Sequence, residues 1–82
     1  MKPNTIAVIK FLKANHGVDF TAADVAQALS LDVRTVNGIF TGAISNKGLG
    51  VRVASEVLGA DDKTVVVKYL KLTDAGLAVE LA

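Results

Sequence analysis

Hydrophobic residues recur with a helical period over the first part of the chain. Between Asn4 and His16 they form one broad apolar face, with lysines pointing away from it. The members of this face are Val8, Ile9, Phe11 and Leu12. The pattern predicts a first helix from about Asn4 to His16, capped by Asn4 or Thr5 and stopped by a left-handed Gly17.

A second helix is predicted to begin at Thr21 and to stop at Ser30. The Thr21 hydroxyl and the Asp24 carboxylate have the spacing of a capping box, in which each side chain accepts a hydrogen bond from the other residue's amide. After a short turn, Asp32 stands where the N-cap of a third helix is expected.

The third helix has one apolar and one polar face. The apolar face contains Val33, Val36, Ile39, Phe40 and Ala43. We expect Phe40 to be buried between the helices and the elements that follow, because it lies in the middle of this face. Gly42 is expected to mark a helix end or a bend, since glycine is unfavourable inside a helix.

Beyond Gly48 the period changes from 3.6 to 2. Valines at 51, 53 and 57 alternate with other residues, residues 59–63 have turn chemistry, and residues 64–72 are rich in β-branched side chains. A β-hairpin is therefore predicted, followed by a helical stretch that Thr73 caps. Leu77 and Leu81 fall one turn apart on that stretch.

The composition fits one small domain covering residues 1–82. Of the 82 residues, 51% are apolar and 21% are charged, which is the profile of a folded chain and not of a disordered one. There is no cysteine, and no apolar run approaches the length of a membrane span. We expect a soluble, cytoplasmic protein without a membrane partner.

The net charge of +1 hides an uneven distribution along the chain. Residues 33–55 contain Arg34, Lys47 and Arg52 and no acidic residue, so the positive surplus lies in this block. An anionic partner is expected to bind there.

No catalytic or metal-binding pattern is present in the sequence. His16 is the single histidine, and no serine has the Gly-x-Ser-x-Gly context of a hydrolase nucleophile. Gly48 and Gly50 begin a dinucleotide-binding fingerprint, but Val53 occupies the place of its third glycine. We expect neither an enzyme nor a protein that needs a cofactor or a metal.

Residues 25–37 have the spacing of a helix-turn-helix motif, with the small Ala26 at the contact between the two helices. Together with Lys47-Gly48-Leu49 and the segment 69–76, which contains Leu72-Thr73-Asp74-Ala75-Gly76, this motif resembles the winged-helix domain of MarR-like bacterial transcription regulators. The resemblance implies an α+β winged helix-turn-helix fold, with a three-helix core, a two-stranded β-hairpin wing and a short C-terminal helix. The helix-turn-helix would span about residues 21–46 and the wing about residues 50–72.

The sequence departs from those regulators at several places. Gly38 and Gly42 stand where their recognition helix often carries arginines, and Ser30 stands where their turn often has glycine. The stretch between Thr35 and Gly48 is about one residue longer than usual. The wing tip contains the acidic pair 61–62, whereas theirs tends to be basic.

The resemblance implies a transcriptional regulator that binds double-stranded DNA with its third helix in the major groove. Asn37 would pair with adenine, Arg34 would bind guanine or a phosphate, Lys47 and Arg52 would hold phosphates, and Lys63 would help at the wing. The expected DNA-binding residues are Arg34, Thr35, Asn37, Gly38, Thr41, Ser45, Lys47, Arg52 and Lys63.

A second function stays open, that of a winged-helix module that binds protein and little or no DNA. The small positive surplus and the acidic wing tip favour it. The oligomeric state stays open between a monomer and a homodimer, and a dimer would use Phe11 and Ile6 of the first helix together with the short C-terminus.

Overall fold

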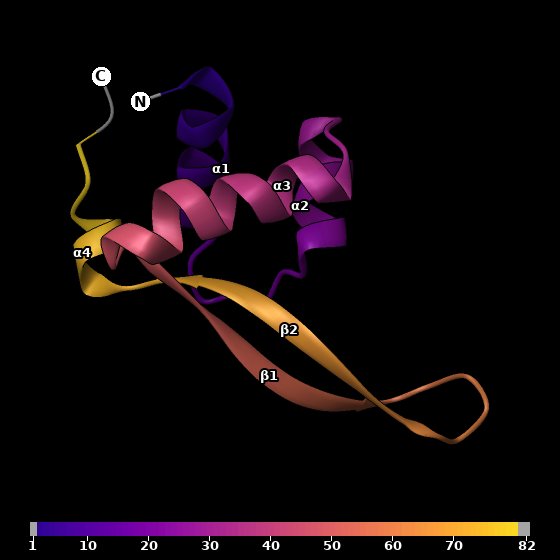
Figure 1. Ribbon diagram of the computed structural model, residues 1–82. Coiled ribbons are helices and arrows are strands. Elements are labelled where there is room, and N and C mark those ends of the chain that lie inside the picture. Colours follow the sequence, from indigo (N-terminus) through magenta and orange to yellow (C-terminus); the bar gives the residue numbers. More distant parts are fainter. Residues whose placement is uncertain (1, 81–82) are drawn as a thin grey trace.

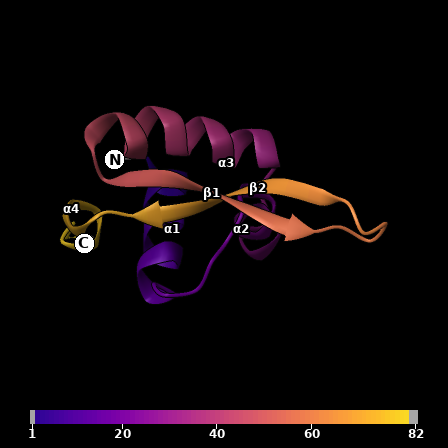
Figure 2. The same ribbon diagram turned by 90° about the horizontal axis from the view of Figure 1, so that it is seen from below.

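A computed structural model describes residues 2–80 of the chain. Its elements are α1 (Pro3–Ala14), α2 (Ala22–Leu29), α3 (Val33–Ile39), the π-helical turn η1 (Phe40–Ile44), the 3₁₀ turn η2 (Ser45–Lys47), β1 (Gly50–Leu58), β2 (Thr64–Leu72) and α4 (Asp74–Leu77). The helices pack together on one side, and the β1–β2 hairpin extends away from them (Figures 1 and 2). The molecule is therefore elongated, about 44 Å by 25 Å by 21 Å. This order of elements confirms the expected α+β architecture.

No helix in the described part of the chain is long and apolar enough to cross a membrane.

The first helix begins earlier than the sequence analysis predicted. Lys2 is its N-cap residue and Pro3 is the first helical residue, so the prediction of a cap at Asn4 or Thr5 is wrong. Proline suits this position because its φ angle is already helical and its missing N–H would have no partner in the first turn. Thr5 is instead buried inside the helix. Gly17 has a φ of +89° and follows the helix end, as expected.

The turn between α2 and α3 is built by local hydrogen bonds. The Asp24 amide donates to the Thr21 hydroxyl at 3.2 Å and the Thr21 amide donates to the Asp24 carboxylate at 3.0 Å, which confirms the capping box. Ser30 closes α2 in the left-handed region, with a φ of +57°, where a glycine would carry no Cβ penalty. Asp32 takes the N-cap position of α3, but its side chain makes no capping hydrogen bond.

A π-helical turn shifts the buried face of the third helix. Val36 and Phe40 are fully buried, as predicted, but Ile44 is fully buried where Ala43 was expected, and Val33, at the start of α3, is 45% exposed. In the π-helical turn from Phe40 to Ile44 each hydrogen bond joins residues five apart in sequence, whereas in an α-helix it joins residues four apart. The turn therefore accommodates the extra residue noted between Thr35 and Gly48. Gly42 lies inside this turn, so the irregularity expected there is confirmed.

The segment from Leu72 to Gly76 contacts the residues just before β1, so the two ends of the hairpin are held together. Thr73 caps α4, since its hydroxyl accepts from the Gly76 amide at 3.2 Å, and it also donates to the Gly48 carbonyl at 2.7 Å. A Cβ on Gly76 would lie 1.9 Å from the Leu49 carbonyl oxygen, so only glycine fits. Leu81, expected on this last helix, lies outside the described residues.

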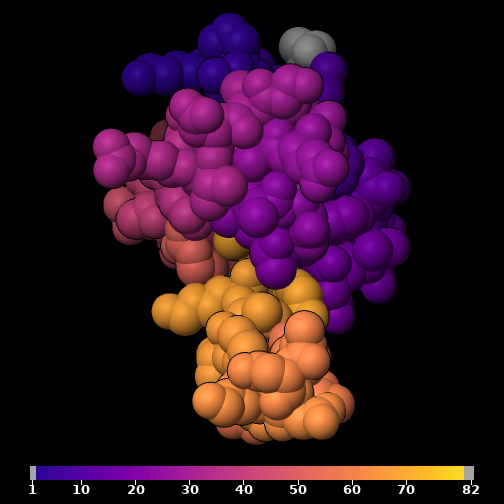
Figure 3. All heavy atoms as spheres, turned by 90° about the vertical axis from the view of Figure 1, so that its right-hand side faces the viewer, coloured from indigo at the N-terminus to yellow at the C-terminus, as the bar shows by residue number. Residues whose placement is uncertain are grey.

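The hairpin is antiparallel and regular, and Gly50 pairs with Leu72 and Leu58 with Thr64. At its base the Leu70 amide donates to the Phe20 carbonyl at 2.7 Å, and Thr21 forms an isolated β-bridge with Tyr69 of β2. The outer half of the hairpin stands apart from the helices (Figure 3).

Truncation of Phe40 tests this packing. We expect Phe40→Ala to lower the free energy of unfolding by about 3–5 kcal/mol, because it leaves a cavity where helices and hairpin meet. Urea denaturation measures the change, with the exposed Thr35→Ala on the same helix as control. A loss no larger than that of the control would contradict the described packing.

Candidate nucleic-acid interface

The solvent-facing side of α3 and η1 carries two different rows of residues. Residues three and four apart are neighbours on a helix surface, so Thr35, Ile39 and Gly42 line one flank, which faces the beginning of α1. Asn37 and Thr41 line the other flank, which faces β1. Arg34 and Gly38, which are both exposed, also line the flank beside α1.

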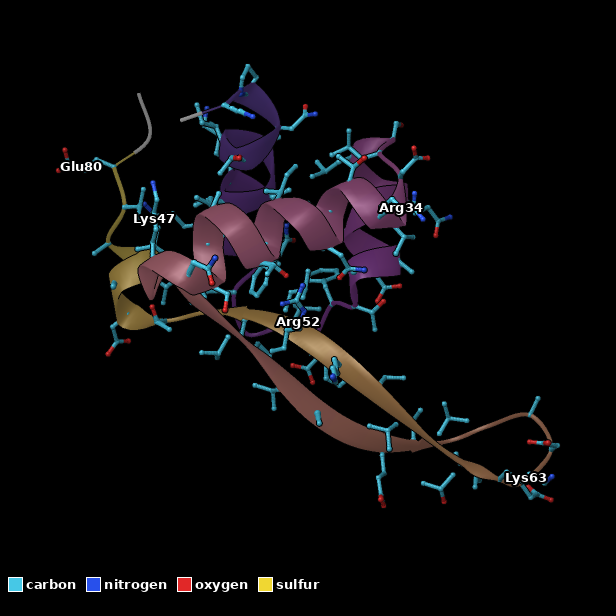
Figure 4. All side chains as sticks on the ribbon, viewed as in Figure 1. Arg34, Lys47, Arg52, Lys63 and Glu80 are labelled. Atoms are coloured by element: carbon cyan, nitrogen blue, oxygen red, sulfur yellow. The ribbon has the colours of Figure 1, made fainter. Side chains whose placement is uncertain are left out.

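The flank beside α1 forms an open groove of about 540 Å³. Its lining residues are Lys2, Thr5, Arg34, Thr35, Gly38, Ile39, Gly42, Ala43 and Lys47. Three of them are basic and none is acidic, so the groove has a positive potential. Arg34 and Lys47 lie at opposite ends of the helical stretch (Figure 4). An extended anion that follows the helix would meet a cation at each end.

The flank beside β1 is organised by Arg52. Its Nη2 atom donates to the Thr41 hydroxyl at 3.0 Å, and to the Asn37 carbonyl and side-chain oxygens at 3.3 Å each. The guanidinium also lies over the Phe40 ring, 4.9 Å from its centroid. Because a guanidinium is planar and has a fixed fork of donors, this contact sets the position of β1 relative to the helix.

The contact with Arg52 also orients the Asn37 side chain. An arginine only donates, so the Asn37 atom that faces it is the carbonyl oxygen Oδ1. The Asn37 amide group, which carries the two donor hydrogens, then faces away from Arg52. Oδ1 still has a free lone pair, so the side chain keeps both a donor and an acceptor for a ligand.

The structure brings together some of the predicted residues and separates others. Arg34, Thr35, Gly38 and Lys47 share the groove, and Asn37, Thr41 and Arg52 share the other flank. Ser45 is half-buried in the 3₁₀ turn and lines neither flank. Lys63 lies at the hairpin tip, remote from the helix (Figure 4).

Lys2 is the cation that the sequence analysis did not find. It is distant in sequence from the basic block of residues 33–55, and it reaches the groove because α1 packs against α3. No local pattern in the sequence indicates that Lys2 lies beside Arg34 and Lys47.

Gly38 and Gly42 line the groove and, having no side chain, form its floor. A Cβ on either residue would meet no atom of this chain within 4 Å, and neither residue has a positive φ. The fold therefore does not require these glycines, although each costs roughly 1 kcal/mol relative to alanine in a helix.

No group of three or more histidine, aspartate or glutamate side chains within residues 2–80 is arranged to hold a metal ion.

Comparisons with known proteins identify the fold. No family model matches the sequence, and no curated protein matches it. The structure is similar to that of MepR, a transcription regulator of the Staphylococcus aureus multidrug efflux pump MepA, with a TM-score of 0.72 and 22% sequence identity. The match covers 94% of this chain and 50% of the MepR chain, so the chain spans half of MepR's length. The chain thus has the winged helix-turn-helix fold that MepR has, which confirms the fold its motifs suggested.

Proposed function

We propose that the chain is a small DNA-binding transcriptional regulator, that residues 1–82 act as one winged-helix domain in the cytoplasm, and that α3 enters the major groove. The observation that carries the proposal is the groove beside α3, where Lys2, Arg34 and Lys47 surround a glycine floor with no acidic lining residue. The winged-helix fold and its likeness to a transcription regulator support the same function.

Each exposed residue of α3 has a role in this proposal. Arg34 stands in the first turn of the helix, where recognition helices contact base edges, and it binds guanine or a phosphate. Asn37, oriented by Arg52, offers the donor and the acceptor that adenine requires. Thr35, on the flank beside α1, and Thr41, on the flank beside β1, donate hydrogen bonds to bases or phosphates.

The groove cations and the glycines bind the sugar–phosphate backbone. Lys2 and Lys47 neutralise phosphates, and the absence of a side chain at Gly38 and Gly42 lets the backbone approach the helix closely. Ser45, at the end of the same helical stretch, donates to a phosphate.

Arg52 and Lys63 have smaller roles in DNA binding. One guanidinium nitrogen of Arg52 is engaged by α3, and its remaining donors hold a phosphate at the base of the wing. Lys63 approaches DNA only if the hairpin tip does, and there Asp61 and Asp62 oppose the contact.

A protein-binding module is the second candidate, and a specific observation favours it. The outer half of the hairpin exposes Leu58 (72%), Val65 (48%) and Val66 (59%), which is unlike a surface made to contact phosphates. Neither candidate function involves catalysis.

The salt dependence of binding to duplex DNA tests the proposal. Phosphate contacts by Lys2, Lys47 and Arg52 predict that log K falls with log[salt] at a slope of about −2.7 per protomer, which becomes about −3.6 if Arg34 also binds a phosphate. Lys47→Ala is expected to reduce the slope by about 0.9, and Lys10→Ala, on the exposed face of α1, is the matched control.

Arg34→Ala distinguishes the two roles of that residue. Loss of a phosphate contact flattens the slope, whereas loss of a guanine contact costs ~1–3 kcal/mol of discrimination at one base pair. If folded Lys47→Ala and Arg34→Ala proteins keep the wild-type slope and specificity, the groove does not bind DNA.

Gly38→Ala is expected to stabilise the protein and to weaken DNA binding. The new methyl group meets open space in the free protein, so the free energy of unfolding rises by about 0.5–1 kcal/mol. In the complex it obstructs the close approach of the backbone, and affinity falls roughly fivefold or more. Urea denaturation and fluorescence anisotropy measure the two effects. Unchanged affinity in the stabilised variant would remove the glycines from the interface.

The hairpin tip is tested by Asp61→Asn together with Asp62→Asn. If the tip lies near the duplex, loss of both negative charges tightens binding by a few-fold at low salt, and the effect disappears near 1 M salt, where the Debye length is about 3 Å. Asparagine tolerates the left-handed conformation of Asp62, so the turn is preserved. Equal affinities at low salt would place the tip away from DNA.

A further inference from the structure

The outer edge of β1 has unpaired backbone groups. The Gly59 amide donates to the Lys63 carbonyl, and the Thr73 amide donates to the Leu49 carbonyl, so the odd-numbered residues of β1 direct their backbone groups toward β2. The even-numbered residues from 52 to 58 therefore direct their N–H and C=O groups outward. No hydrogen bond to these groups is found within the described residues.

The outer edge of β2 differs because its base is paired with another segment. Its Leu70 amide is bonded to Phe20, and the ion pair of Lys71 with Asp19 holds that segment in place. Farther out, Lys68 is exposed on β2, and a lysine on an edge strand discourages further pairing. Among the described residues, the outer edge of β1 is unpaired from 52 to 58 and carries no lysine, whereas that of β2 is paired at Leu70 and carries Lys68 on its free part.

The sequence of β1 is complementary to itself about Ala54. In an antiparallel pair of two β1 strands centred on Ala54, Arg52 of each copy lies opposite Glu56 of the other. The residue at the centre is small, so the two chains approach without a clash. The two-fold symmetry makes this charge pair occur twice.

The opposite face of the same strand gains apolar pairs. In this register, Val51 of one copy faces Val57 of the other, and Val51 and Val53 are 47% and 46% exposed in the single chain. A slip by one residue would turn Arg52 and Glu56 toward the valine face, so the side-chain pattern fixes the register.

We propose that β1 is a dimerisation edge, at which a second copy of this chain pairs antiparallel about Ala54 to form a continuous four-stranded sheet. A two-stranded hairpin is marginally stable alone, and the outer half of this one has no support from the helices (Figures 1 and 3). The second copy is the partner because the charge pattern is palindromic. The dimer does not require the proposed DNA binding, although both use donors of Arg52 that α3 leaves free.

Two proline variants test the edge. Ala54→Pro removes an outward N–H on β1 without loss of a β1–β2 hydrogen bond, and Val66→Pro does the same on the free edge of β2. Sedimentation equilibrium from micromolar to millimolar protein is expected to show a monomer–dimer equilibrium for the wild type and for Val66→Pro. Ala54→Pro is expected to remain monomeric.

A charge reversal tests the register without proline. Glu56→Lys replaces two attractive pairs per dimer by two repulsive ones, and the dissociation constant is expected to rise roughly tenfold or more. Asp61→Lys makes the same change of charge at the hairpin tip, outside the paired segment, and is expected to leave the dissociation constant unchanged. In the wild type, amide hydrogen exchange at Arg52, Ala54 and Glu56 is expected to slow as protein concentration rises, whereas exchange at Val66 does not.

Three results overturn the proposal. A wild-type chain that is monomeric at millimolar concentration has no such interface. A dimer that Glu56→Lys and a folded Ala54→Pro leave intact uses another surface, such as the first helix. Concentration-dependent protection at Val66 instead of Ala54 would place the contact on β2.

Discussion

The burial of Phe40 is the interaction on which the other parts of this structure depend. Its ring is fully buried where the helices meet the hairpin, and the Arg52 guanidinium lies over it. A Cβ on Gly50 would lie 2.8 Å from the ring, so β1 begins with a glycine in order to pass this close. The position of the wing relative to the third helix is thus fixed by one aromatic side chain and its two neighbours on β1.

The two flanks of the third helix follow from this arrangement. Arg52 approaches from the hairpin and engages Asn37 and Thr41, so that flank has a fixed hydrogen-bonding pattern. The other flank faces the beginning of α1 and stays open, with cations at its borders and glycines on its floor. One flank is therefore suited to reading base edges and the other to a close approach of the phosphate backbone.

The wing of this protein lacks the basic tip that would suit insertion into a DNA groove. Its surface is suited to a different contact. Its tip carries Asp61 and Asp62, its strands expose valines, and the edge of β1 is unpaired. In a β1-paired dimer the backbone groups of this edge are satisfied and the valine row becomes continuous between the copies. The groove beside α3 and the edge of β1 are different surfaces that have Arg52 in common, so variants at Lys47 and at Ala54 test the two proposals one at a time.

The sequence alone determined the elements whose causes are local. The capping box at Thr21, the left-handed Gly17, the alternating valines and the Thr73 cap each depend on residues within a few positions of one another. It also located the burial of Phe40 and the basic block. Tertiary structure decided what depends on distant residues. Lys2 joins Arg34 and Lys47 only because α1 packs on α3, and Ile44 is buried instead of Ala43 because the π-helical turn adds a residue after Phe40. A periodic pattern assumes one constant rise and rotation per residue, and packing against another element is what changes them.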